Sequence, residues 1–396
     1  MRIKRKIAEA VESLAGYMVS INKAIFDKPE ICFKEKFASG LVMDYLKSNG
    51  FSIEAPAAGL DTALKAIRKG KGKGPRVALI AEYDALPEMG HACGHSMIAA
   101  SACAAAVAIN RAVPNHPGSL MVIGTPAEEG GGGKITMINR GAFKNVDAAM
   151  MVHPSNKTRV VCRMYAIADV EFTFTGKAAH AAAFPDQGIN ALDAGVLFYN
   201  AVSALRQQMK DEARVHGVFT RGGDAPNIIP ERVVMRFFVR ALERGYFSEL
   251  MAKVAECARG AAKSAGCKVR IKKMGHSYDP FHPSYPIGEA FRENMKFIGI
   301  DEDSFGETEE IGSSDIGNLS QAVPTLHPEY AIGGREDINH SRNFLKAVMS
   351  ARGKKAMIGM TKAMALTAYD LFTNPGLMAQ VREEFKRRVP QGGKKD

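Results

Sequence analysis

Thiol, imidazole and carboxylate side chains gather in two short segments of the chain. Cys93 and His95 stand two residues apart in AEYDALPEMGHACGHS, and Glu128 and Glu129 are adjacent in SLMVIGTPAEEGGGG. Thiolate and imidazole are ligands that borderline metals such as zinc prefer. Of two adjacent acids, one can bind a metal while the other takes a proton from water, as metal-assisted hydrolysis requires. The structural alternatives are a buried cysteine beside a capping histidine, and a solvated acidic loop.

Two further histidines could complete such a site. His153 directly follows the apolar run VDAAMMV, and His340 opens an expected helix after a glycine-containing loop. A histidine on a surface loop is the alternative for His340. The glycine run after Glu129 is not a phosphate-binding loop, because Ile135 stands after Gly133-Lys134, where that motif needs Ser or Thr.

Short apolar runs precede three of these candidate positions. RVALIA, SLMVIG and VDAAMMV are typical of strands buried on both faces, and the stretches at 96–111 and 134–140 between them have helical character. Helical periodicity also covers 3–26 and 34–48 at the start of the chain. Strands that alternate with helices predict an α/β sheet whose ligands gather beyond the carboxyl ends of the strands.

The pattern changes near residue 169. Alternating runs such as VEFTFTG and RVVMRFFVR predict strands with one solvated face, and long helical stretches separate them. We therefore expect an α/β fold in which a mixed-sheet catalytic domain with helices on both faces, residues 1–168 and 281–396, is interrupted by a smaller α+β domain at 169–280. An apolar strand at 324–332 would return to the first sheet.

Composition excludes several other classes of protein. The chain has 396 residues, of which 46% are apolar and 24% charged, with a net charge of +11. The basic residues are spread out and lack interleaved aromatic residues, so we expect no nucleic-acid partner. Six scattered cysteines indicate reduced thiols and a cytoplasmic protein. No apolar run reaches eighteen residues, so we expect no membrane partner.

Several motifs resemble those of one known family. HACGH, GTPAEEGGGG, GKAAHAAAFPDQGINALDA, NIIPE and GSSDIGNLSQAVPTLHPEYAIG occur in order over nearly the whole chain. They are similar to the aminoacylase/carboxypeptidase superfamily of two-metal metallopeptidases, and most similar to its aminobenzoyl-glutamate hydrolase and β-alanyl-lysine dipeptidase branch. The resemblance implies that the smaller domain is a lid that also forms a homodimer contact.

The resemblance also implies roles for individual residues. Cys93 would lie between two divalent ions, zinc or manganese, with His95 and His153 at one and Glu129 and His340 at the other. Glu128 would be the general base. His327 competes with His340 for the last ligand position, and we prefer His340 because the helix after it matches the family better.

In the lid, His180 would stabilise the oxyanion in the neighbouring subunit's site. Asn227 and Arg240 would hold the free carboxylate of the substrate, a planar anion that suits a guanidinium group. Ser96 departs from the family pattern, which commonly has an acid or an amide after HACGH.

These observations predict metal-dependent hydrolysis of the amide bond of a small N-acyl amino acid or dipeptide. Three alternatives remain open at this point. The chain could be an amidohydrolase or deaminase that acts on a C–N bond of a small aromatic or xenobiotic compound, a hydrolase with Cys93 as its nucleophile, or a non-catalytic relative that only binds.

Overall fold

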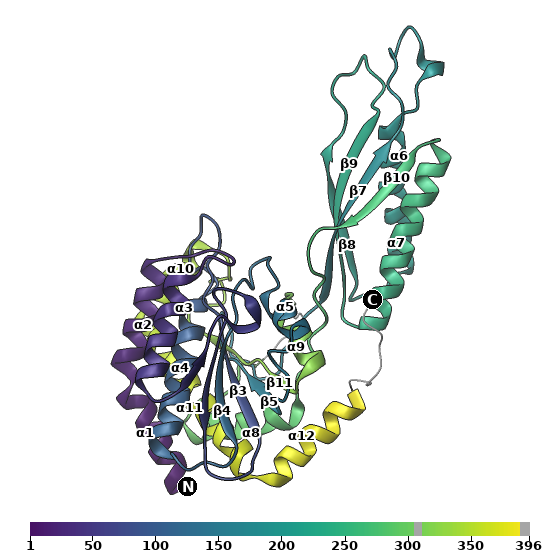
Figure 1. The fold of residues 1–396 in the computed structure, drawn as a ribbon. Helices are drawn as coiled ribbons and strands as arrows, with labels where there is room; N and C mark the ends of the chain where they lie inside the picture. Colours follow the sequence, from purple (N-terminus) through teal and green to yellow (C-terminus); the bar gives the residue numbers. More distant parts are fainter. Residues whose placement is uncertain (305–310, 389–396) are drawn as a thin grey trace. The chain divides into compact units, whose positions relative to one another are not determined.

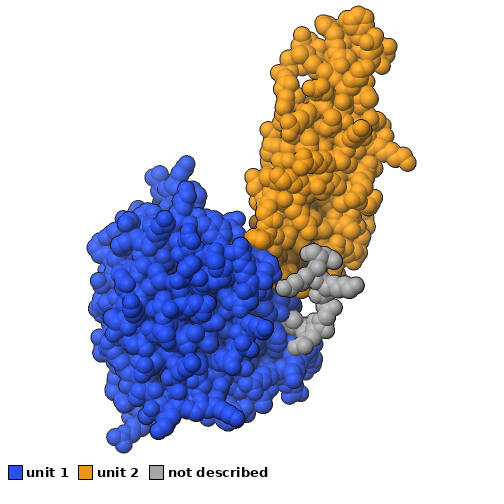
Figure 2. Space-filling model, viewed as in Figure 1, with its two compact units in different colours: residues 1–162, 282–310, 318–396 blue, residues 163–281, 311–317 orange. Residues whose placement is uncertain are grey.

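The computed structural model describes residues 1–304 and 311–388, which form two compact units. One unit comprises Met1–Cys162, His282–Glu310 and Asn318–Asp396, and the other Arg163–Phe281 and Ile311–Gly317 (Figure 2). The expected α/β fold with an inserted smaller α+β unit is confirmed.

A six-stranded mixed sheet forms the centre of the first unit (Figure 1), with the strand order β1-β2-β4-β3-β5-β11. β3 is parallel to β4 and β5, and β5 is parallel to β11, whereas β2 is antiparallel to β1 and β4. The strands are β1 (Ser52–Glu54), β2 (Leu64–Lys69), β3 (Arg76–Ala81), β4 (Ser119–Gly124), β5 (Ala148–Met150) and β11 (Thr325–Leu326). A separate parallel pair consists of β6 (His153–Ser155) and β12 (Glu329–Ala331).

Helix α4 is the central helix of this unit. Nearly all of its residues are buried, because it packs on β3 and β4 and also contacts α1, α2 and α11. The helices of the first unit are α1 (Arg2–Ser13), α2 (Ala15–Asp27), α3 (Lys36–Ser48), α4 (His95–Ala112), α5 (Gly133–Asn139), α8 (Tyr285–Phe297), α10 (Arg342–Val348), α11 (Ala351–Thr373) and α12 (Pro375–Arg388), and α9 (Ile316–Ala322) begins in the second unit.

The strand order explains where a site can form. The chain passes from β3 to β4 in one direction across the sheet and from β4 to β5 in the other. Right-handed crossovers then place α4 and α5 on opposite faces, and the reversal leaves a crevice beyond the carboxyl ends of the strands. The segments after β3, β4 and β5 carry the candidate residues to this edge.

The second unit is an antiparallel sheet with two long helices (Figure 1). Its order is β10-β7-β9-β8, so β8 and β10 are edge strands. Phe172, Phe198 and Phe237 are at most 1% exposed and pack with ring centroids 4.5–5.8 Å apart. The elements are β7 (Ala166–Thr175), α6 (Ala191–Leu205), β8 (Arg214–Arg221), β9 (Arg232–Ala241), α7 (Arg244–Ser264) and β10 (Lys268–Lys273).

Two predicted elements are wrong in detail. The helix expected at 3–26 is broken into α1 and α2 at Leu14, and the strand expected at 324–332 is divided into β11 and β12, which belong to different sheets. Within the described residues, no helix combines the length and apolar character needed to cross a membrane.

Candidate metal centre

A sharp turn at the start of α4 brings the thiol and the first imidazole together. Gly94 separates Cys93 from His95 and has φ +80°, and a Cβ there would lie 2.5 Å from Pro154 Cγ. Glycine is the residue that tolerates both the positive φ and the close approach. Cys93 and His95 are buried as a result.

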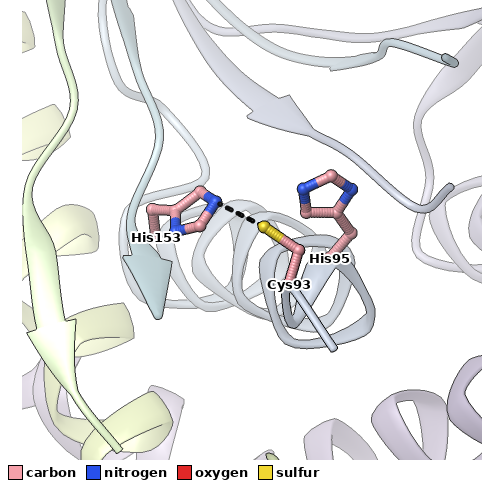
Figure 3. A group of neighbouring side chains, drawn as sticks. All are labelled: Cys93, His95 and His153. Carbon is pink, nitrogen blue, oxygen red and sulfur yellow. Dashed lines mark hydrogen bonds between the residues drawn. The ribbon is translucent and has the colours of Figure 1, made fainter. Parts of the chain in front are cut away.

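His153 approaches the thiol from the first position of β6 (Figure 3). Its Nε2 lies 3.7 Å from Cys93 Sγ, while its Nδ1 is 2.7 Å from the Pro154 carbonyl oxygen. Because a carbonyl oxygen only accepts, Nδ1 carries a proton and donates to it, which leaves Nε2 facing the thiol. Cys93, His95 and His153 form the first of three clusters whose potential ligand atoms lie within 4.8 Å of one another.

Asp84 fixes the orientation of His95. Its Oδ1 lies 2.9 Å from His95 Nδ1, and its Oδ2 accepts a hydrogen bond from the backbone N–H of Glu129 at 2.9 Å. His95 Nε2 is buried, lies 3.4 Å from Glu82 Oε2, and makes no hydrogen bond within the described part of the chain. A carboxylate behind an imidazole whose other nitrogen lacks a hydrogen bond is the arrangement that metal-binding histidines usually show.

The second cluster consists of Cys93, Glu129 and His340. His340 has φ +66°, and its N–H donates to the Ala92 carbonyl oxygen at 2.9 Å, which ties the distant C-terminal loop to the Cys93 segment. His340 Nε2 is 3.2 Å from Glu129 Oε1. The third cluster, His95, Glu128 and Glu129, brings the second acid of the pair to the same place.

The charges in these clusters favour a bound cation. Burial raises the pKa of the Cys93 thiol, but His95 and His153 outweigh it and lower that pKa to about 6. Hydrogen bonding to Cys93 and Glu129 raises the pKa of His340 to about 10. Anionic donors that attract protons this strongly also suit a divalent cation, so the residues present fit a metal site.

A buried ion pair adjoins the clusters. Lys134 Nζ lies 2.5 Å from Glu82 Oε1, and both side chains are fully buried. Burial raises the pKa of Glu82, but Lys134 together with His95 and His153 outweighs burial and lowers that pKa to about 2. The sequence motifs do not reveal this pair, although an acid directly after the wholly apolar strand RVALIA is a usable signal.

His327 lies outside all three clusters that the described residues form. It is buried, its ring centroid is 5.2 Å from that of His153, and its backbone oxygen accepts a hydrogen bond from Cys162 Sγ at 3.3 Å. Burial lowers the pKa of His327 to about 3, so the ring is neutral. The structure thus places His340, rather than His327, beside Glu129.

Two of the lid residues share one end of the second unit. His180 and Asn227 lie on adjoining segments, and Ala181 N–H donates to the Asn227 carbonyl oxygen at 3.0 Å. His180 is exposed, and its Nδ1 accepts a hydrogen bond from Ala183 N–H at 3.1 Å. Since Nδ1 accepts, a proton of the ring lies on Nε2, where it can donate to an oxyanion.

Arg240 lies at the other end of the same sheet. β9 pairs with β7 so that Arg240 is opposite Ile167, whereas Arg232, close to Asn227 in sequence, is opposite Thr175. Eight residues of strand correspond to roughly 26 Å. Arg240 is half-buried and donates to Ser313 Oγ at 3.0 Å. Within one chain, Asn227 and Arg240, the two residues expected to hold the substrate's carboxylate, therefore lie far apart.

The fold and the clusters define a metal-binding hydrolase of the α/β class. Residues 78–345 match the model of the peptidase family M20/M25/M40. The chain belongs to this family, which confirms the predicted resemblance, and it is a hydrolase that binds divalent metal.

Similar proteins align over nearly the whole chain. A Xaa-Arg dipeptidase of Mus musculus is 39% identical, with 98% of this chain and 93% of that protein covered, and the Homo sapiens Xaa-Arg dipeptidase is 36% identical with the same coverage. A p-aminobenzoyl-glutamate hydrolase chain from Escherichia coli K12 is 27% identical, covering 97% and 95%. A dinuclear metal-binding peptidase from Bacillus subtilis has the same fold, with a TM-score of 0.74 at 19% identity, covering 91% and 99%.

Proposed function

We propose that this protein hydrolyses the amide bond of dipeptides whose C-terminal residue is basic, with two divalent ions held on either side of Cys93. The membership of Cys93 in two clusters carries this proposal, because a shared thiolate can bridge neighbouring ions. The names of the mammalian relatives at 39% and 36% identity support the substrate class.

Each cluster would supply one ion with protein ligands. Cys93, His95 and His153 would hold the first ion, and Cys93, Glu129 and His340 the second. Zinc and manganese both suit a set of one thiolate, one carboxylate and three imidazoles. When bound, the ions would polarise the scissile carbonyl group and lower the pKa of the attacking water.

Glu128 would act as the general base. It belongs to the cluster with His95 and Glu129, next to the two clusters that would supply the ligands, and a carboxylate at that place can transfer a proton to and from the reacting groups. Glu128 would take a proton from the attacking water as the new C–O bond forms, and would deliver it to the amide nitrogen as the C–N bond breaks. His180 Nε2–H would stabilise the negative charge on the carbonyl oxygen between these two steps.

The test is a substrate panel with metal-loaded enzyme. Dipeptides ending in Arg or Lys are compared with dipeptides ending in Ala or Glu and with p-aminobenzoyl-glutamate, and Glu128→Gln serves as the isosteric control. We expect the highest kcat/KM for the basic dipeptides and a loss of about 10²–10⁴-fold in kcat in Glu128→Gln. A preference for p-aminobenzoyl-glutamate would contradict the proposed substrate class and would favour the substrate named for the Escherichia coli relative. An active Glu128→Gln variant would contradict the role of Glu128 as the general base.

We further propose that a working site needs two chains. In one chain His180 and Arg240 lie at opposite ends of the second unit's sheet. β8 is an edge strand, and it and α6 expose the apolar side chains of Val218, Phe219, Val196, Leu197 and Tyr199, each 39–61% exposed. Apolar residues on an open sheet edge are typical of a surface that pairs with another chain.

Subunit complementation tests this arrangement. Glu128→Ala and His180→Ala chains, which we expect to be inactive each on its own, are mixed under conditions that exchange subunits. If His180 acts in the neighbouring subunit, the mixed dimer contains one site with both residues intact and activity returns. A mixture that stays inactive although mixed dimers form would place His180 in its own chain's site, and a monomer by sedimentation would exclude the dimer.

A further inference from the structure

The loop that carries Glu128 and Glu129 is held by a buried acid far away in sequence. The Glu35 side chain is fully buried, and its Oε1 accepts a hydrogen bond from Ala127 N–H at 2.9 Å. Ala127 directly precedes Glu128 and has φ +59°, a conformation that non-glycine residues rarely adopt. A hydrogen bond to its N–H therefore stabilises a backbone geometry that alanine does not favour by itself.

The side chain of Glu35 does not cap α3, the helix that it precedes. It stands at the N-cap position of α3 but makes no side-chain cap. Glu30 instead accepts hydrogen bonds from Phe37 N–H and Ala38 N–H in the first turn of this helix, at 2.9 and 3.0 Å. Helix capping and the contact with Ala127 are thus divided between two different glutamates, which allows each to be tested separately.

The other contacts of Glu35 fix its carboxylate. Oε1 also accepts from Phe33 N–H at 2.8 Å, and Oε2 accepts from Thr62 Oγ1 at 2.7 Å. Thr62 is itself buried, and its carbonyl oxygen accepts a hydrogen bond from the Tyr83 hydroxyl group. A carboxylate with this many donors has one orientation, so it can serve as a fixed point for the loop.

We propose that Glu35 is a positioning residue for the general base, which it orients by fixing the Ala127 amide. Asp84 fixes a second position of the same loop, because its Oδ2 accepts a hydrogen bond from Glu129 N–H at 2.9 Å. Glu128 lies between these two anchored amides and would keep its carboxylate within reach of the reacting water. The inference rests on the proposed role of Glu128, and displacement of a catalytic group by about 1 Å can cost about 10²-fold in rate.

Two conservative variants distinguish the effect of side-chain length at position 35 from the effect of its negative charge. Glu35→Asp keeps the charge but is one methylene shorter, so it cannot span to Ala127 N–H. Glu35→Gln keeps the length, because its amide oxygen can accept from Ala127 and Phe33 while its NH₂ group donates to the Thr62 hydroxyl group. We expect kcat to fall about 10–100-fold in Glu35→Asp and to stay within about threefold of the wild type in Glu35→Gln, with KM and bound metal unchanged in both.

Glu30→Ala is the matched control for stability. It removes the cap of α3 and lowers the melting temperature, but it leaves the Ala127 contact intact, so kcat should be retained. Full kcat in Glu35→Asp, or an equal loss of kcat in Glu30→Ala, would overturn the inference. Glu35→Gln as slow as Glu35→Asp would overturn it too, because charge rather than reach would then matter. If the proposed function itself fails, Glu128→Gln remains active. That result distinguishes failure of the proposed function from failure of the inference about Glu35.

Discussion

Lys134→Met should destabilise the first unit strongly. Lys134 Nζ lies 2.5 Å from Glu82 Oε1, and neither side chain is exposed. Methionine fills a similar volume without a charge, so the Glu82 carboxylate would stay buried without its cation. Removal of one partner of a buried ion pair costs about 3–5 kcal/mol, because the remaining charge keeps its desolvation penalty.

Thermal unfolding at fixed metal saturation measures this effect. A loss of 1 kcal/mol lowers the melting temperature of a domain of 150–250 residues by about 2–4 °C, so Lys134→Met should melt roughly 6–20 °C below the wild type. Lys144→Met is the matched control, because Lys144 is exposed and its replacement should change the free energy of unfolding by less than about 0.5 kcal/mol.

The double variant Glu82→Gln/Lys134→Met tests the cause. Both charges are removed, so no unpaired carboxylate stays buried, and the double variant should recover more than half of the lost melting temperature. The reasoning is refuted if Lys134→Met melts within about 2 °C of the wild type, or if the double variant melts no higher than the single one.

Two other substitutions have expected outcomes of a different kind. Asp84→Ala removes the hydrogen bonds to His95 Nδ1 and Glu129 N–H, so metal affinity measured by titration calorimetry should fall about 10–100-fold, and a change below threefold would argue against it. Phe198→Ala opens a cavity beside Phe172 and Phe237, so the second unit should lose about 3–5 kcal/mol in urea unfolding while metal affinity is retained. A loss below 1 kcal/mol would show that these rings do not form the core.

The sequence predicted the strands that are buried on both faces accurately. The runs at 76–81 and 119–124 coincide with β3 and β4, because an uninterrupted apolar run can only lie inside the sheet. β2 was not predicted, since LKAIRK mixes three basic residues with apolar ones and resembles a loop. Its position next to β4 depends on long-range pairing that local patterns do not encode.

Most of the candidate metal ligands follow buried strands in the sequence, so motif and spacing were enough to nominate them, and the structure brings them together with His340 in clusters. The supporting residues were harder to find, because a buried acid such as Glu35 has the same local sequence context as a solvated one. Lys134 gave the same difficulty, since only the folded structure shows that it faces Glu82. The separation of Arg240 from Asn227 also depends on strand register, which the motifs do not reveal.

The central claim is that amide hydrolysis depends on divalent ions held around Cys93. The most direct test is a titration of chelator-stripped enzyme with zinc or manganese, in which bound metal per chain and hydrolysis of a dipeptide ending in Arg are measured at each step. We predict no activity without metal and full activity once two ions are bound per chain. Full activity with no bound metal would contradict the claim and would favour Cys93 as a nucleophile.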